Sequence, residues 1–125
     1  NYGEYRQVFE RMAERIKKLQ TGDGFWHTDL LSPKLFDMPE VSGTVLFAFG
    51  LLKGINTNIL GKEYLDCAIR AYNAITDVAI DENGRIGWVQ TVAWDPGVVK
   101  KENTNVYAVG TYLKASYELL KLMDK

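Results

Sequence analysis

The sequence predicts an all-α fold of tandem αα-hairpins with one small β-hairpin, and two observations lead to this prediction. Four segments space their apolar residues three and four apart, as one face of a helix requires. The first and third segments are amphipathic, whereas the second and fourth are apolar on nearly every face. Outer helices that alternate with enclosed inner helices are typical of an α/α toroid or solenoid.

The first predicted helix covers residues 2–20, where Glu, Arg and Lys separate the apolar positions and leave one solvated face. The Thr-Gly-Asp-Gly stretch that follows ends this helix, because glycine accepts the positive φ of a helix terminus or tight turn. A loop then runs to about residue 40. Residues 41–55, "VSGTVLFAFGLLKGI", are apolar all round, so we expect a helix enclosed on most sides.

The second half repeats this order. Residues 62–79 predict an outer amphipathic helix, with Glu63 and Asp66 near its favourable N-terminal end. Asn83-Gly84 is a strong two-residue turn signal, and its flanks have β character, which predicts a small β-hairpin over residues 82–94. Residues 104–123 are again largely apolar and predict a second enclosed helix.

An internal repeat supports two tandem hairpins. Gly43-Thr44 opens "GTVLFAFGLLK" and Gly110-Thr111 opens "GTYLKASYELLK", and a turn and a tryptophan precede each segment. Repeat folds generally need three or more units to cover their core, so a pair leaves apolar inner-helix surface exposed. We therefore expect either a homo-oligomer or a missing N-terminal portion.

Composition limits the possible classes of protein. The 125 residues suit one domain, residues 1–125, and 46% hydrophobic with 25% charged residues argue against disorder. A net charge of −1 is too balanced for a nucleic-acid surface, and no apolar run is long enough to cross a membrane. We expect a soluble chain, cytoplasmic or periplasmic if bacterial. One histidine and one cysteine give no metal-ligand spacing, and no nucleotide-binding motif occurs, so we expect no metal and no cofactor.

The stretch "DGFWHTDLLSPKLFDMPEVSGTVLFAFGLLKGI" resembles the unsaturated glucuronyl and galacturonyl hydrolases of glycoside hydrolase families 88 and 105. In that family an Asp-Gly-aromatic-Trp loop, a Pro and a Glu-x-Ser-Gly-Thr-Ala helix start recur in this order. "DENGRIGWVQ" and "YAVGTYLKASYEL" are similar to a later turn and the final inner helix, so the resemblance covers most of residues 10–122. It implies an (α/α)6 toroid of six hairpins, of which this chain is about the last third.

The resemblance also implies an activity. These enzymes hydrate the C4=C5 double bond of an unsaturated uronic acid, after which the sugar ring opens and the glycosidic bond breaks, with an aspartate as general acid and base. That aspartate and an Arg-Gly-Asn-Gly-Trp-like segment lie in the part that precedes this chain, and no "RGNGW" string occurs here. We therefore assign no catalytic residue and expect the chain alone to be inactive.

The aromatic candidates for sugar contact are Trp26 and Trp88. An aromatic ring at the mouth of an inner helix can stack on a sugar. The alternative is that Trp26 caps the core with Phe25, and that Trp88 and Trp94 pack their hairpin against a helix. We expect Trp26 to face the sugar while Phe25 seals the core.

The polar candidates are His27, Glu40, Ser42 and Thr44. His27 titrates near neutrality but has no adjacent nucleophile in the sequence, so we expect polar contact with substrate rather than catalysis. Glu40 either contacts ligand or caps the helix that follows it. Ser42 and Thr44 start that helix, where a hydroxyl or N–H group can meet the carboxylate of a uronic acid.

Three functions remain open at this point. The first is the C-terminal portion of a glycoside hydrolase that acts on an oligosaccharide with an unsaturated uronic acid, in which this chain supplies a wall of the cleft. The second is a non-catalytic carbohydrate-binding or oligomerising helical module. The third is a helical-repeat scaffold for protein partners.

Overall fold

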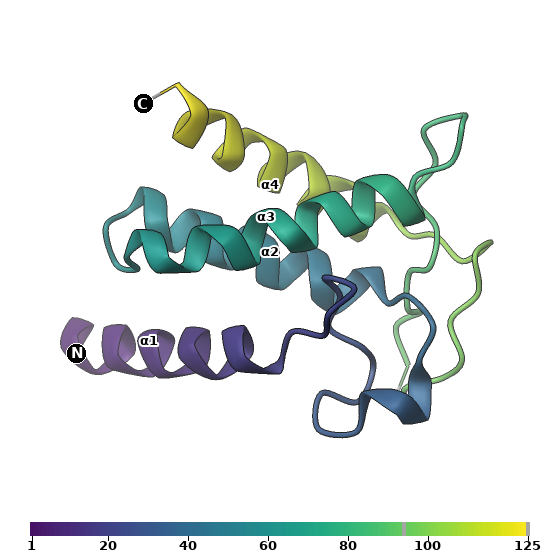
Figure 1. Ribbon diagram of the computed structural model, residues 1–125, viewed down its shortest axis with the longest axis horizontal. Helices are drawn as coiled ribbons and strands as arrows, with labels where there is room; N and C mark the ends of the chain where they lie inside the picture. Colours follow the sequence, from purple (N-terminus) through teal and green to yellow (C-terminus); the bar gives the residue numbers. More distant parts are fainter. Residues whose placement is uncertain (94, 125) are drawn as a thin grey trace.

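The computed structural model describes residues 1–93 and 95–124, and this part of the chain folds into four α-helices (Figure 1). The helices are α1 (Tyr2–Leu19), α2 (Val41–Asn56), α3 (Leu65–Ala74) and α4 (Val106–Met123). Short 3-10 turns, η1 (Pro33–Phe36) and η2 (Lys62–Tyr64), precede α2 and α3, and a π-helical turn, η3 (Ile75–Ala79), extends α3. The all-α prediction is confirmed, and none of these helices has the length and apolar character needed to cross a bilayer.

Side chains cap the starts of three helices. The Asn1 and Asn105 side chains accept hydrogen bonds from amides in the first turns of α1 and α4, and Glu40 does so for α2. The end of α1 differs from the prediction, because Gln20 leaves the helix in an extended conformation and the positive φ comes later, at Gly24 (+89°). A Cβ atom at Gly24 would lie 2.7 Å from the Arg70 carbonyl oxygen, so this turn presses on α3 and needs glycine.

Helix α2 forms the centre of the molecule. It packs against α3 and α4, and Figure 1 shows α3 in front of it. Two groups of buried residues meet along α2: one joins it to α1, α3 and the residue Trp26, and the other joins it to Phe25, η3 and the 86–89 segment. The prediction of an enclosed helix at 41–55 is confirmed by the burial of eight of its residues.

The other inner helix, α4, is not enclosed by this chain. Only Ala108, Ala115 and Glu118 of α4 are buried, while Leu113 is 63% exposed and Val109, Tyr117 and Leu120 are exposed on the same helix. No other element in the described residues covers that face, so this chain alone does not enclose the second inner helix, which agrees with the expectation that a pair of hairpins leaves inner-helix surface exposed. Helix α1 likewise exposes apolar side chains that the amphipathic pattern assigned to its packed side: Tyr2, Tyr5, Val8 and Met12.

The predicted β-hairpin over 82–94 does not form in the described residues. The turn itself is present, with φ +79° at Gly84 and its amide bonded to the Asp81 carbonyl, but only one isolated bridge, between Ile80 and Ile86, joins the flanks. The backbone beyond Ile86 finds other partners. The Trp88 carbonyl accepts the Val41 amide, and the Val89 amide donates to the carbonyl of Asn103, so no second strand is left to pair. Trp94 lies outside the described residues.

Candidate functional site

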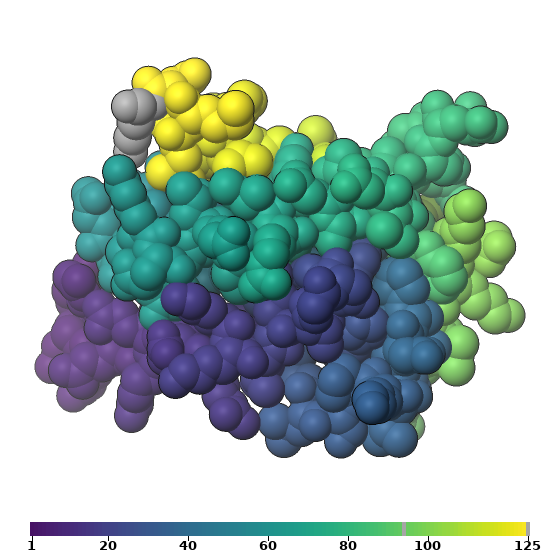
Figure 2. Space-filling model, viewed as in Figure 1, coloured from purple at the N-terminus to yellow at the C-terminus, as the bar shows by residue number. Residues whose placement is uncertain are grey.

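Both inner helices begin at the same end of the molecule, where the long loops lie. The loop over residues 20–40 leads into α2, and the loop over residues 80–105 leads into α4. Figure 1 places these loops at the right, opposite the start of α1 and the α2–α3 connection, and Figure 2 shows that they form the surface of this end. All six residues that the sequence singled out for sugar contact lie at or beside this loop end, which is the candidate site.

Trp26 belongs to the core. Its side chain is 1% exposed, its ring meets the Phe47 ring edge to face at 5.3 Å, and its indole Nε1–H donates to the Ile16 carbonyl oxygen at 2.8 Å. Because neither face of the ring is accessible, the expectation that Trp26 stacks on a sugar does not fit this structure. Phe25 is equally buried and seals the second core group, as expected.

Thr44 ties this loop to α2. The Trp26 amide donates to Thr44 Oγ1 at 3.0 Å, and the Thr44 hydroxyl donates back to the Trp26 carbonyl oxygen at 3.3 Å. Thr44 is fully buried. Its hydroxyl therefore positions the loop from inside the protein and does not reach the surface where a uronic acid would bind.

The first three amides of α2 are occupied by the chain itself. The Val41 amide donates to the Trp88 carbonyl at 2.9 Å, and the amides of Ser42 and Gly43 donate to the two Glu40 carboxylate oxygens at 2.7 and 2.8 Å. Helix capping by Glu40 is thus confirmed, and its buried carboxylate already provides the negative charge that a helix N-terminus favours. A uronic acid carboxylate at this helix start would have to displace Glu40.

Ser42 is held in a small hydrogen-bonded cluster with Gln90 and Tyr107. Its Oγ accepts from the Gln90 amide at 2.7 Å and lies 3.0 Å from Tyr107 Oη, whose hydroxyl donates to the Gln90 carbonyl at 2.5 Å. This cluster joins the starts of α2 and α4 to the 88–91 segment. Ser42 therefore fixes the shape of the loop end, and its contacts lie within the chain.

Trp88 has an unusual backbone conformation. Its φ of +56° lies in the left-handed region, which bulky residues rarely adopt. This conformation directs the Trp88 carbonyl to the start of α2, as described above, while the side chain stays partly exposed and packs against the second core group. Of the predicted aromatic contacts that the structure describes, Trp88 is the one that is not fully buried.

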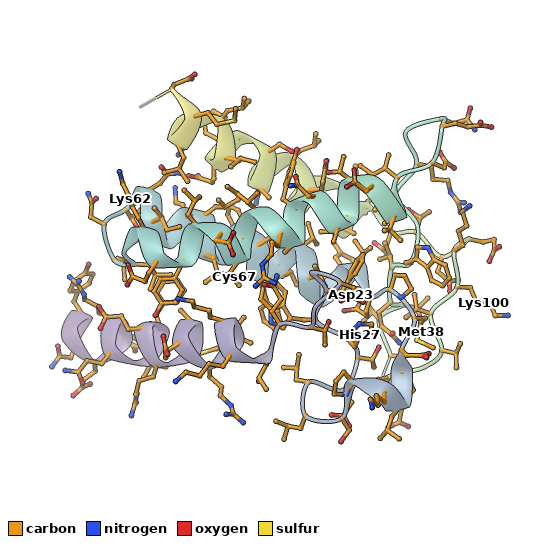
Figure 3. All side chains as sticks on the ribbon, viewed as in Figure 1. Asp23, His27, Met38, Lys62, Cys67 and Lys100 are labelled. Atoms are coloured by element: carbon orange, nitrogen blue, oxygen red, sulfur yellow. The ribbon has the colours of Figure 1, made fainter. Side chains whose placement is uncertain are left out.

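His27 is buried and contacts only acceptors at its two ring nitrogens. Its Nδ1 lies 3.0 Å from the carbonyl oxygens of both Phe36 and Met38, and its Nε2 lies 2.9 Å from Asp23 Oδ2. Figure 3 shows Asp23, His27 and Met38 close together beside the loop end. With an exposed fraction of 6%, His27 holds two loop segments together and does not present its ring to solvent.

The pKa of Asp23 reflects this arrangement. Burial alone raises the pKa of its carboxyl, but hydrogen bonds from the Thr21 hydroxyl, the Phe25 amide and His27 outweigh burial and lower the pKa below the ordinary value. Asp23 is therefore an ionised carboxylate at neutral pH.

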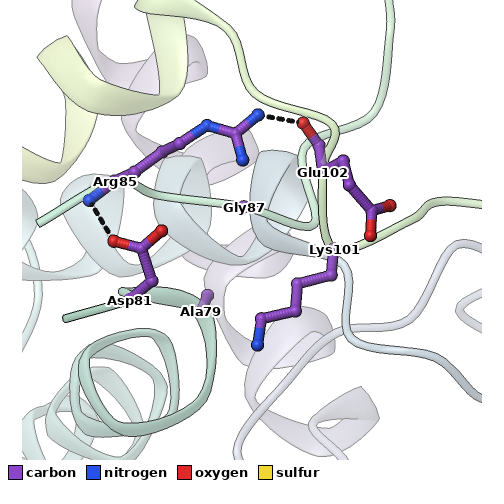
Figure 4. Close-up of a pocket in the computed structure, with 6 residues that line it drawn as sticks. All are labelled: Ala79, Asp81, Arg85, Gly87, Lys101 and Glu102. Atoms are coloured by element: carbon purple, nitrogen blue, oxygen red, sulfur yellow. Dashed lines mark hydrogen bonds between the residues drawn. The ribbon is translucent and has the colours of Figure 1, made fainter. Parts of the chain in front are cut away.

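A hollow on the 80–105 loop lies apart from these residues (Figure 4). Arg85 donates to the Glu102 carbonyl, the Asp81 carboxylate accepts the amides of Asn83 and Arg85, and Lys101 lines the same hollow. Two acidic residues offset the two basic ones, so the lining of the hollow has no net formal charge. Among residues 1–93 and 95–124, no three His, Cys, Asp or Glu residues gather into a metal-binding set.

The structure also reveals three contributors that the sequence did not single out: Asp23, Gln90 and Tyr107. Gln90 and Tyr107 act through contacts distant in sequence or through backbone, and such contacts have no fixed spacing to recognise. Asp23 offered the clearest signal, since it stands four residues before the only histidine.

Comparison with known proteins identifies relatives over almost the whole chain. The model of Glycosyl Hydrolase Family 88 matches residues 1–123. An unsaturated 3S-rhamnoglycuronyl hydrolase of Formosa agariphila is 38% identical over 121 residues, which is 96% of this chain and 32% of that protein. The chain spans about a third of the length of the curated relatives that it matches.

Two solved structures share the fold. A glycosyl hydrolase family 88 protein from Bacteroides vulgatus superposes with a TM-score of 0.88 and 32% identity over 95% of this chain and 35% of its own. A protein described as a polysaccharide lyase superposes with a TM-score of 0.90 and 30% identity, over 99% of this chain and 36% of its own.

Proposed function

Because the chain belongs to glycosyl hydrolase family 88, we propose that it is part of a glycoside hydrolase that acts on oligosaccharides with an unsaturated uronic acid. The family match over residues 1–123 is the observation that carries this proposal, and the hydrolase relative from Formosa agariphila supports it. In this proposal the chain supplies one wall of the cleft, and the catalytic aspartate lies in a part of the fold that the chain does not include.

The uncovered faces support a partial toroid domain. One apolar groove lies between α1 and α2, lined among others by Met12, Leu46 and Phe47. The second uncovered face is on α4, around Leu113 and Tyr117, so the two faces belong to different helices. We propose that further hairpins of one ring cover both faces, from the same polypeptide or from other copies of this chain.

The roles of the candidate residues follow from their positions. Glu40, Ser42, Thr44 and His27 position the loop end through internal hydrogen bonds. Trp26 anchors the loop in the core. Trp88 is the residue that we propose for sugar contact, because it is partly exposed at the loop end and an aromatic ring can stack on a pyranose ring.

A chimera tests the proposal. Residues 1–123 replace the matched 121-residue stretch of the Formosa agariphila hydrolase, and hydrolysis of an unsaturated disaccharide is followed by loss of the absorbance of its C4=C5 double bond. We expect the chimera to be active and the isolated chain to be inactive. A folded chimera without activity would contradict the proposal.

A matched pair of variants tests Trp88 in the same chimera. Trp88→Ala removes the stacking surface, and the expected fall in kcat/KM is several-fold, from about 1 kcal/mol of aromatic contact. Trp88→Phe keeps a ring and should lose less. Equal losses in both variants would mean that the residue acts through the backbone turn rather than through sugar contact.

The relative described as a polysaccharide lyase gives a second candidate reaction. A lyase forms the C4=C5 double bond by elimination, whereas the proposed hydrolase consumes it. The same absorbance would then rise with a saturated polyuronate and stay constant with the unsaturated disaccharide. A non-catalytic carbohydrate-binding module would instead change tryptophan fluorescence on adding sugar, with no change in double-bond absorbance in the chimera.

A further inference from the structure

The surroundings of His27 set the number of protons that the ring must hold. Three acceptors face its two nitrogens: the Phe36 and Met38 carbonyls at Nδ1, and the Asp23 carboxylate at Nε2. A neutral imidazole has one N–H and one lone pair, so one of its nitrogens would point a lone pair at an acceptor. Both contacts are favourable only when a proton lies at each end of the ring.

The second proton belongs to Nε2 and not to Asp23. Asp23 Oδ1 already accepts hydrogen bonds from the Thr21 hydroxyl at 2.6 Å and the Phe25 amide at 3.1 Å. Bonds donated to a carboxylate favour its ionised form. The contacts therefore favour a buried imidazolium beside a half-exposed carboxylate, an arrangement that makes a charge-assisted hydrogen bond.

No other charged side chain in the described residues forms an ion pair with His27. Asp29, on the segment that follows it, uses its carboxylate for the amides of Leu31 and Ser32. Glu40 uses both carboxylate oxygens at the start of α2. The Phe25 ring lies edge-on at 6.4 Å, and Asp37, between the two carbonyl acceptors of the 36–38 segment, makes no ion pair with the ring.

We propose that His27 and Asp23 form a protonation-dependent latch that positions the 28–40 loop at the candidate site. With both ring nitrogens protonated, His27 ties the turn at Asp23 to the carbonyls of Phe36 and Met38. Loss of the Nε2 proton as the pH rises sets a lone pair against the carboxylate and releases the loop. The latch is independent of the proposed function, because it rests on contacts within this chain and requires no sugar.

Asp23→Asn is the informative variant. Its amide oxygen can keep the bonds from Thr21 and Phe25, while its NH2 group takes the place of Oδ2 and donates to a neutral Nε2. This variant therefore closes the latch without the second ring proton. Asp29→Asn is the matched control, since it makes the same carboxylate-to-amide change on the same loop without touching the ring.

The single histidine makes the protonation state directly measurable. Long-range 1H–15N spectra of the full chain at neutral pH should show two protonated ring nitrogens in the wild type and in Asp29→Asn. In Asp23→Asn they should show one protonated and one pyridine-like nitrogen. A wild-type spectrum with a pyridine-like nitrogen in the folded chain would overturn the proposal, even if Asp23→Asn does not fold.

Trypsin cleavage after Lys34 reports release of the loop, because Lys34 is exposed in η1 and is cut faster when that turn opens. An opening that releases one proton becomes up to about tenfold more populated per pH unit. The cleavage rate of the wild type, divided by that of Asp23→Asn at the same pH, should therefore rise as the pH increases above neutrality. A ratio that stays constant with pH would refute the latch.

Discussion

Replacing Trp26 by alanine tests whether this residue serves the core or the substrate. The side chain is buried to 1% exposure, and it loses the Phe47 contact and the Nε1 hydrogen bond to Ile16 on truncation. Large-to-small changes at buried tryptophan cost about 3–5 kcal/mol. A domain of this length has a free energy of unfolding of roughly 6–19 kcal/mol, so Trp26→Ala should remove a large part of it.

Urea denaturation followed by far-UV circular dichroism measures this loss. With a slope of about 2 kcal/mol per molar urea, the midpoint should fall by roughly 2 M. Trp26→Phe keeps most of the apolar contact but loses the hydrogen bond from the indole N–H, which is worth about 1 kcal/mol. Its urea midpoint should therefore lie between those of the wild type and Trp26→Ala. Unchanged midpoints in both variants, together with lost sugar binding, would refute the assignment of Trp26 to the core.

Four further outcomes are expected. Glu40→Ala should destabilise the chain by about 1–2 kcal/mol through loss of the α2 cap, and Glu40→Gln by less; equal stability in urea would contradict the capping role. Gly24→Ala should cost about 1–3 kcal/mol, because φ is +89° and the new Cβ meets α3; a neutral effect on the thermal midpoint would argue against the close approach. Since the pKa of Asp23 is lowered in the folded state, its stabilising contribution is present above the ordinary carboxyl pKa and disappears as the pH falls through the lowered value. In acid denaturation, the free energy of unfolding of Asp23→Asn should therefore fall less with decreasing pH than that of the wild type. Leu113→Ser should change the stability of the isolated chain by less than about 0.5 kcal/mol, yet destabilise the active chimera by about 1–2 kcal/mol, and equal effects would contradict the covered face.

The helices could be predicted because their signals are local. Three of the four predicted helices lie within two residues of the observed bounds, and the third, residues 62–79, covers η2, α3 and η3 together. The repeated glycine and threonine at the starts of α2 and α4 also marked the paired inner helices correctly. Each of these signals depends on spacing within one short stretch of chain.

The loop end could not be predicted in the same way, because distant parts of the chain determine it. The 80–89 segment has the residues of a hairpin, but Val41 and Asn103 offer its backbone better partners. Trp26 and Trp88 both follow a glycine turn, yet one is buried by Ile16 and Phe47 and the other stays partly exposed. Sequence spacing does not distinguish these outcomes.

Cys67, the single thiol of the chain, lies in the core on α3 with 2% of its surface exposed. Burial also raises the pKa of this thiol, so the reactive thiolate is scarce in the closed protein. A thiol reagent can therefore modify Cys67 only when the core around α3 opens. The rate of labelling therefore measures how often this core opens, and the measurement needs no engineered cysteine.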